Sequence, residues 1–187
     1  MQVYLMRHTT PNIEKGICYG QTDMEVEENL FAEELKLIKT KLPNHIEQFF
    51  TSPLKRCKNL AENLNTNFIE NSNLMEMNFG DWENKKWDEI LSDEFNKWME
   101  NFVEVKTPNG ENFIELNNRT NLFFDEIIQK EYESVAIVTH AGNIRSIICT
   151  VLGLPLANAF KIDLGYGAVV SLKMGKELNM CKLLSIN

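Results

Sequence analysis

The sequence lacks the motifs that mark the common nucleotide-binding, serine-dependent and metal-dependent enzymes. It contains no GxxxxGK[ST] loop, no GxGxxG fingerprint, no GxSxG elbow and no HExxH motif. A DxDxT motif for aspartate-based phosphoryl transfer is also absent. The three histidines are well separated along the chain, so they cannot supply a histidine-rich metal centre. We therefore expect a protein that binds no metal and needs no cofactor.

Cysteine is scarce, and its spacing excludes two further kinds of site. The four cysteines are Cys18, Cys57, Cys149 and Cys181. None forms a CxxC pair, so no zinc site is indicated. A cysteine phosphatase needs arginine six residues after its nucleophile, but those positions hold Met24, Asn63, Pro155 and Asn187. We expect reduced, mostly buried thiols in a cytosolic chain.

Long apolar runs and excess positive charge are missing as well. No apolar run approaches the roughly 20 residues that a membrane helix needs. The first residues lack the basic region and apolar stretch of a secretory signal. A net charge of −8 argues against nucleic acid or an anionic membrane as the main partner. We expect a cytoplasmic protein with a small-molecule partner. A phosphate ligand stays compatible with this charge, since a site needs only a few local cations.

Apolar runs alternate with helical patterns along the 187 residues, which fits one domain spanning residues 1–187. The pattern predicts strands at 3–6, 48–51, 68–69, 135–139, 168–172 and 180–184. It predicts helices at 30–42, 52–64, 112–132 and 143–152. Pro53 would stand early in its helix, where its missing N–H costs little. This alternation indicates an α/β fold: a mostly parallel central sheet flanked by helices on both faces, in three layers.

Polar residues follow three of these predicted strands. Arg7 and His8 follow the first strand, Arg56 lies shortly after the second, and His140 follows the strand at 135–139. In open α/β sheets, ligands bind outside the carboxyl ends of the strands. Two of the three histidines and two arginines therefore converge on the expected ligand site.

These residue types suit phosphoryl transfer. A neutral imidazole at His8 is a nucleophile at neutral pH. Arg7 and Arg56 offer planar forks that match phosphate oxygens and neutralise the charge of the transfer. His140, at a predicted helix N-terminus, adds a donor and the helix dipole. A departing alkoxide needs a proton, and Glu76, in a turn-rich stretch, is the candidate acid.

Four segments containing these residues resemble the histidine phosphatase superfamily, which has the phosphoglycerate-mutase-like fold. They occur in family order, at residues 5–9, 52–57, 76–83 and 138–145. The resemblance implies that His8 is phosphorylated, that Glu76 donates the proton, and that Arg7, Arg56 and His140 form the phosphate pocket. Thr9 stands where the family usually has glycine, and Ala141-Gly142 stands where it usually has two glycines.

Within the superfamily, residues 7–11 and 16–23 are similar to the alpha-ribazole phosphatases, as is the segment Thr107–Asn112. Those enzymes dephosphorylate alpha-ribazole 5′-phosphate late in cobalamin biosynthesis. The resemblance places Tyr19 and Gly20 among the substrate-binding residues. It therefore implies a phosphoric monoester hydrolase acting on a small-molecule phosphomonoester.

Three alternatives stay open at this point. The same chemistry serves a broad-specificity phosphatase or a phosphoglycerate mutase. A catalytically silent phosphate-binding protein would differ in class, but the presence of both His8 and Glu76 speaks against it. Residues 82–112 are predicted to form a thin helical flap over the site, which would admit water and favour hydrolysis over transfer.

Several other residues could have a functional role or only a structural one. An aromatic cluster could stack on a flat base, but packing of the flap against the core is the favoured interpretation. Its members are Phe79, Trp82, Trp87, Phe95, Trp98 and Phe102. We expect His45 at the surface and Arg145 in a structural pair. We expect Glu83 and Glu111 to act at most as supports of the site.

Overall fold

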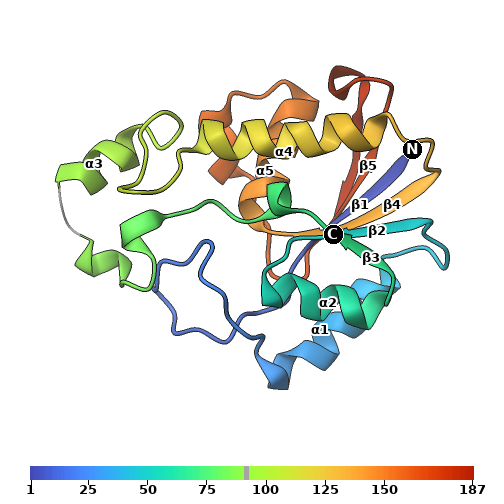
Figure 1. The fold of residues 1–187 in the computed structure, drawn as a ribbon, viewed down its shortest axis with the longest axis horizontal. Helices are drawn as coiled ribbons and strands as arrows, with labels where there is room; N and C mark the ends of the chain where they lie inside the picture. Colours follow the sequence, from blue (N-terminus) through green and yellow to red (C-terminus); the bar gives the residue numbers. More distant parts are fainter. Residues whose placement is uncertain (91–92) are drawn as a thin grey trace.

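A computed structural model describes residues 1–90 and 93–187 of the chain (Figure 1). It contains one six-stranded sheet with the strand order β3-β2-β4-β1-β5-β6. The strands are β1 (Gln2–Arg7), β2 (Gln48–Thr51), β3 (Phe68–Glu70), β4 (Ser134–Thr139), β5 (Val169–Lys173) and β6 (Lys182–Ile186). The first four are mutually parallel, whereas β5 and β6 run antiparallel to their neighbours. The predicted mostly parallel α/β sheet is confirmed.

Helices cover both faces of this sheet, which gives the predicted three layers (Figure 1). Helices α1 (Glu28–Thr40) and α2 (Lys55–Leu64) lie on one face, and α4 (Phe113–Ile128) and α5 (Ala141–Leu152) lie on the other. Because successive strand residues point to opposite faces, Leu5 packs in one hydrophobic cluster with α4 and α5, and Met6 packs in the other with α1 and α2.

Two element boundaries differ from the sequence prediction in ways that matter for the site. The helix predicted from residue 52 begins only at Lys55. Ser52 precedes Pro53, and helical geometry is disfavoured at the residue before a proline. The prediction of an early helical Pro53 was wrong. The helix after β4 begins at Ala141, two residues earlier than predicted, and His140 is its N-cap.

The other boundaries shift by a few residues. The predicted 112–132 helix ends at Ile128, and the last two strands lie at 169–173 and 182–186. A 3-10 turn, Leu178–Met180, occupies the beginning of the last predicted strand. The chain thus turns before β6 can pair with β5.

The segment predicted as a flap contains short helical elements, namely 3-10 turns at Gly80–Trp82 and Trp87–Glu89 and helix α3 (Asp93–Glu100). Residues 91–92 of this segment lie outside the described residues. Its aromatic rings contact one another, and Trp82 and Trp98 are buried against Phe113 and Leu116 of α4. The packing interpretation holds for Trp82 and Trp98, whereas Phe79 and Trp87 also line a pocket.

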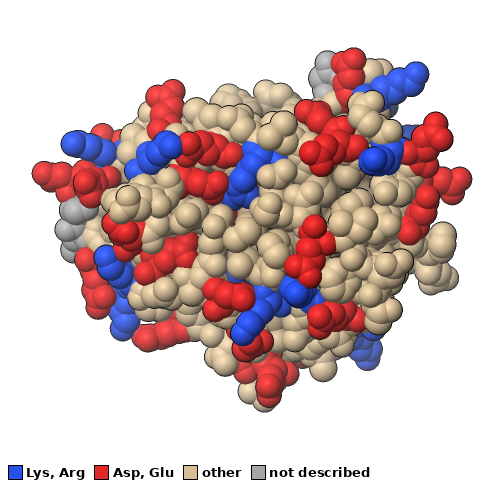
Figure 2. All heavy atoms as spheres, viewed as in Figure 1, with Lys and Arg blue, Asp and Glu red and all other residues tan. Residues whose placement is uncertain are grey.

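Burial and surface charge agree with the composition. All four cysteines are buried and unpaired, as predicted. Among the described residues, no helix is both long enough and apolar enough to cross a bilayer. Acidic side chains predominate on the face shown in Figure 2, with basic ones between them. Positive charge at a ligand site must therefore be concentrated locally.

Candidate active site

His8 follows the last residue of β1, and its side chain is only 2% exposed. Its ring Nδ1 lies 2.7 Å from the Thr9 carbonyl oxygen. Since a carbonyl can only accept, Nδ1 carries the proton and Nε2 is left with a free lone pair. Main-chain hydrogen bonds from His8 N to Thr139 and from Gly167 N to the His8 carbonyl hold the residue between strands. The arrangement presents a fixed, unprotonated nitrogen.

Arg7 and Arg56 flank this histidine, and each is anchored by backbone carbonyls. Arg7 donates to the Leu164 carbonyl, with its guanidinium 3.9 Å from the centre of the Tyr166 ring. Arg56 is fully buried in α2 and donates to the carbonyls of Gly20 and Thr22 at 2.6 and 2.9 Å.

The Nε atoms of both arginines are buried and have no hydrogen-bond partner among the described residues. A buried charged donor without an acceptor is costly. Arg7 lines the pocket beside His8, so an anion bound there could supply the acceptor that its Nε lacks, and this fits a phosphate group.

His140 lies behind His8, with the two ring centroids 5.1 Å apart. Its Nδ1 accepts from Arg56 Nη2 at 3.2 Å, and its Nε2 donates to Ser52 Oγ at 2.8 Å. Both ring nitrogens are therefore occupied by protein groups. This network fixes Arg56 and orders the turn that precedes α2.

Both site histidines are held neutral. Burial is the main cause that lowers the pKa of His8 well below its usual value, and the charges of Arg56 and Arg7 lower it further. The pKa of His140 is likewise lowered by burial, then by Arg56 and His8. A neutral imidazole is the form a nucleophile needs, so His8 is suited to attack phosphorus.

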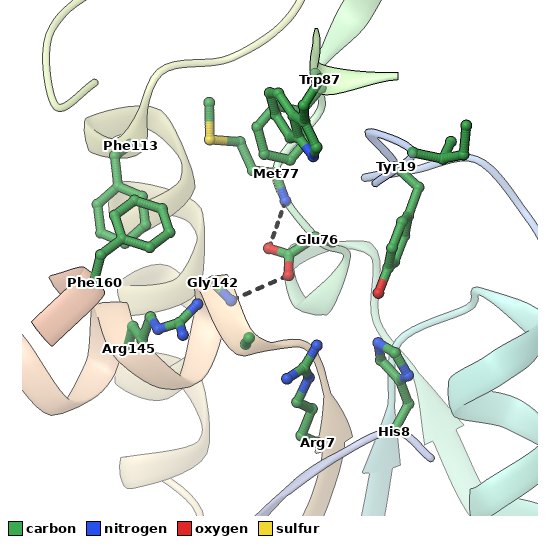
Figure 3. Close-up of a pocket in the computed structure, with 13 residues that line it drawn as sticks. Arg7, His8, Tyr19, Glu76, Met77, Trp87, Phe113, Gly142, Arg145 and Phe160 are labelled. Carbon is green, nitrogen blue, oxygen red and sulfur yellow. Dashed lines mark hydrogen bonds between the residues drawn. The ribbon is translucent and has the colours of Figure 1, made fainter. Parts of the chain in front are cut away.

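Glu76 lies in an irregular stretch between two 3-10 turns, and its carboxylate is aimed into the same pocket (Figure 3). Oε1 accepts from Met77 N at 2.9 Å, and Oε2 accepts from Gly142 N at 3.1 Å. A Cβ on Gly142 would lie 2.1 Å from Glu76 Oε1, so only glycine allows this approach. Of the Ala141-Gly142 pair, the second position is therefore the one that requires glycine.

These residues meet at a pocket of about 300 Å³. Its polar side contains Arg7, His8, Glu76 and Gly142, and Figure 3 shows aromatic rings and Arg145 on the side away from His8. The remaining lining residues are Ile17, Tyr19, Met77, Phe79, Trp87, Phe113, Ala141 and Phe160. Arg56 and His140 are not among the lining residues and support the pocket from behind.

Tyr19 and Gly20, both predicted to bind substrate, lie in different places relative to the pocket. Tyr19 lines the pocket, and its hydroxyl lies 2.7 Å from that of Tyr166. Gly20 does not line the pocket; its carbonyl accepts from Arg56, and a Cβ there would lie 2.0 Å from the Met77 carbonyl. Gly20 thus lets the loop pack closely enough to hold Arg56.

Two expected supports do hold the site's loops. Glu83 accepts from the backbone N–H of Gln21 and Phe79, at 2.8 and 3.1 Å, and joins the Tyr19 loop to the flap. Glu111 pairs with Arg119 behind Glu76. Neither carboxylate is among the residues that line the pocket.

Arg145 was not predicted to reach the site, and the structure places it in the pocket wall. Its Nε donates to the Ile162 carbonyl at 3.0 Å, but no carboxylate of the described residues lies within ion-pair distance. In place of the predicted structural pair, Arg145 has this carbonyl contact, and its guanidinium lies 5.2 Å from the centre of the Phe160 ring. Its position in the second turn of α5, the helix that follows His140, was the signal available in the sequence.

The walls also contain residues that no motif indicated. Trp87 comes from the flap, Phe113 from the start of α4, and Phe160 from a 3-10 helix, Leu156–Lys161. His45 is exposed, as expected of a surface residue, and it does not line this pocket. Within the described residues, no group of three or more His, Cys, Asp or Glu side chains could hold a metal ion.

Comparison with known proteins gives a family match over nearly the whole chain. The sequence profile described as histidine phosphatase superfamily (branch 1) matches residues 3–187. A protein of Hydrogenobacter thermophilus named as a candidate phosphoserine phosphatase is 27% identical over 184 residues, which cover 94% of this chain and 91% of the relative.

Two solved structures share the fold. The alpha-ribazole phosphatase of Shigella flexneri superposes with a TM-score of 0.90 at 20% identity, covering 100% of this chain and 96% of the other. A phosphoserine phosphatase variant of Entamoeba histolytica, solved with phosphoserine, superposes with a TM-score of 0.85 at 19% identity and the same coverage. At these identities the likeness extends to the fold alone.

Proposed function

This chain belongs to the histidine phosphatase superfamily and is a phosphomonoesterase of that superfamily, and we propose that it acts through a phosphohistidine formed on His8. The observation that carries the proposal is the neutral, oriented His8, which lines one pocket together with Arg7, whose buried Nε lacks an acceptor. The phosphoryl group of a substrate would supply that acceptor while its phosphorus faces His8 Nε2.

The reaction then has two steps that balance. His8 Nε2 attacks phosphorus, the bond from phosphorus to the ester oxygen breaks, and Glu76 gives its proton to the departing oxygen. A water oxygen next attacks phosphorus, the bond from phosphorus to His8 Nε2 breaks, and the Glu76 carboxylate takes a proton from that water. Inorganic phosphate leaves, and His8 and Glu76 return to their starting forms.

Rapid quenching with ³²P-labelled substrate tests this mechanism directly. We expect an acid-labile, base-stable label on the protein, located at His8 by peptide mapping. Label on an aspartate or cysteine, or turnover without any labelled protein, would contradict the mechanism.

For the substrate we propose alpha-ribazole 5′-phosphate, as the resemblance to the alpha-ribazole phosphatases of cobalamin biosynthesis implies. The supporting feature is the set of aromatic rings that line the pocket, of which Trp87, Phe113 and Phe160 lie on the side away from His8 (Figure 3). Together with Tyr19 and Phe79 they offer faces and edges to a leaving group that contains a flat ring such as a benzimidazole.

A second candidate, phosphoserine, is favoured by Arg145. This guanidinium faces the pocket and has no carboxylate partner among the described residues. Burial lowers its pKa, so its unpaired charge is costly, and a substrate carboxylate would compensate that charge. The Hydrogenobacter relative, by its name, agrees with this candidate.

A substrate panel separates the two candidates. The kcat/KM for phosphate release should be highest for alpha-ribazole 5′-phosphate among a set that includes phosphoserine, phosphoethanolamine and both phosphoglycerates. Phosphoethanolamine is phosphoserine without its carboxylate, so it isolates the role of Arg145. If phosphoserine is preferred, and Arg145→Met removes that preference over phosphoethanolamine, the second candidate holds and the first is wrong.

A further inference from the structure

The segment that carries Glu76 is supported from behind by an ion pair outside the pocket. Arg119 lies in α4, and Glu111 lies just before that helix. The two side chains are only 15% and 21% exposed. Neither residue lines the pocket, so the pair has no direct contact with a substrate bound there.

Arg119 donates hydrogen bonds to backbone carbonyls of the segment that contains Glu76. Its Nη1 donates to Asn73 and Met75 at 2.9 and 2.5 Å, and its Nη2 donates to the carbonyl of Glu76 itself at 2.9 Å. Asn73 lies in the 3-10 turn Ser72–Leu74, and the carbonyls of Met75 and Glu76 follow it in an irregular stretch, where no strand or helix ladder satisfies them. One planar guanidinium therefore takes the place of secondary structure.

Glu111 orients this guanidinium and holds the other side of the acid. Its two carboxylate oxygens accept from Arg119 Nε and Nη2 at 2.8 and 3.0 Å, a bidentate geometry. Its Oε2 also accepts from Asn78 N at 2.9 Å, and its own N–H donates to the Asn78 carbonyl at 2.8 Å. The Arg119–Glu111 pair thus fixes the backbone before and after Glu76.

Proton donation depends on this placement. The acid must reach the leaving oxygen within hydrogen-bond distance, and an error of about 1 Å can cost up to about 10²-fold in rate. Within the part of the chain that the structure describes, the Glu76 carboxylate is held by Met77 N and Gly142 N. The position of this carboxylate relative to α5 therefore depends on where the backbone of residues 75–78 is held.

We infer that Arg119 and Glu111 are positioning residues for the proton donor. This inference rests on the proposed role of Glu76 and adds the two residues that make that role possible. A pair that only stabilised the fold would slow all substrates alike. A pair that positions the acid must slow substrates with poor leaving groups more than activated ones.

The test compares Arg119→Lys, which keeps the charge but loses the fork, and Glu111→Gln, which keeps the shape but loses the charge. Single-turnover rates of protein phosphorylation are measured with phosphoethanolamine and with p-nitrophenyl phosphate, whose leaving group needs little protonation. We expect each variant to lose about 10–10²-fold on phosphoethanolamine and much less on p-nitrophenyl phosphate. Lys106→Met is the matched control, because it removes an exposed ion pair with Glu115 of the same helix.

A double-variant comparison completes the test. In a Glu76→Gln background, Arg119→Lys should cause little further loss on phosphoethanolamine, because the acid it would position is gone. Equal losses on both substrates, or a full further loss in the Glu76→Gln background, would overturn the inference and leave the role of Glu76 intact. If Glu76→Gln itself shows no dependence on the leaving group, the proposed acid and the inference fail together.

Discussion

The two halves of the pocket are built in different ways. The phosphate half contains Arg7 and His8 at the end of β1, with Arg56 of α2 and His140 after β4 behind them, and all but Arg7 are buried. The leaving-group half takes Trp87 from the flap and Phe160 from a 3-10 helix, and Phe160 is 52% exposed. Because the first half is held by the sheet and the second by loops, substrate preference can change without disturbing the phosphate chemistry.

The two halves of the pocket also differ in their charged groups. The phosphate half holds two arginines whose buried Nε atoms have no acceptor, so it suits any phosphoryl group. The leaving-group half combines aromatic rings with one cation, Arg145, and so discriminates between leaving groups. Changes in the first half should affect all substrates equally, and changes in the second should affect them selectively.

The largest effect should come from His8→Ala. With the nucleophile gone, turnover should fall at least about 10⁴-fold on every phosphomonoester tested, and no labelled protein should form. The measurement is kcat for p-nitrophenyl phosphate and phosphoethanolamine, with circular dichroism to check the fold. Substantial residual turnover on either substrate would mean that another group attacks phosphorus.

A smaller but still uniform loss is expected for Arg56→Lys. Lysine keeps the charge near His8 but loses the fork that binds His140 and two carbonyls at once. We expect kcat/KM to drop about 10²–10³-fold on activated and unactivated esters alike. Lys58→Met, a partly exposed position on the same helix, is the control and should stay near wild type. A loss confined to one class of leaving group would break the distinction between the halves.

Trp87→Leu probes the leaving-group half. Removing one aromatic face should lower kcat/KM for alpha-ribazole 5′-phosphate by about 10-fold, the size of one lost stacking contact. Phosphoethanolamine has no ring and serves as the internal control, with little expected change. Parallel losses on both substrates would indicate that Trp87 acts by packing the flap against Phe79 and Trp98 and not by contacting substrate.

The smallest effect concerns stability against pH. The pKa of both His8 and His140 is lowered in the fold, so below about pH 6.5 the unfolded chain binds more protons than the folded one. The free energy of unfolding should therefore fall as pH drops through about 6.5, until the folded histidines themselves take up protons. Urea unfolding between pH 7.5 and 5 measures this slope.

A histidine variant tests the origin of that slope. His8→Gln should flatten it, because one buried neutral histidine has been removed. An unchanged slope in His8→Gln would show that His8 is not held neutral by its surroundings.

Much of the phosphate half was predictable from the sequence. Arg7, His8, Arg56 and His140 could be located because buried strands are short apolar runs and their carboxyl ends share one edge of the sheet. The strand at residues 48–51 matches its prediction to the residue. Glu76 was named as a candidate acid from the chemistry and the motif, but its place in the pocket could not be predicted, because it lies in a stretch with no periodic pattern.

The leaving-group half could not be predicted in the same way. Trp87, Phe113, Phe160 and Arg145 come from segments far apart in the sequence, and nothing in their spacing indicates that they share one pocket. The flap was predicted as helical, but its aromatic residues carry the same apolar signature whether they pack on each other or face a ligand. Two of the six, Phe79 and Trp87, do both.

The sequence by itself determined the sheet, the order of its polar strand ends and hence the phosphate chemistry, because these depend on local periodicity and on residues next to one another in the chain. The tertiary structure alone decided which side chains face the leaving group, that Gly142 must admit the Glu76 carboxylate, and that Arg119 and Glu111 hold the acid's backbone. Those features are contacts between residues 8 to 66 positions apart, and no local pattern encodes contacts of that kind.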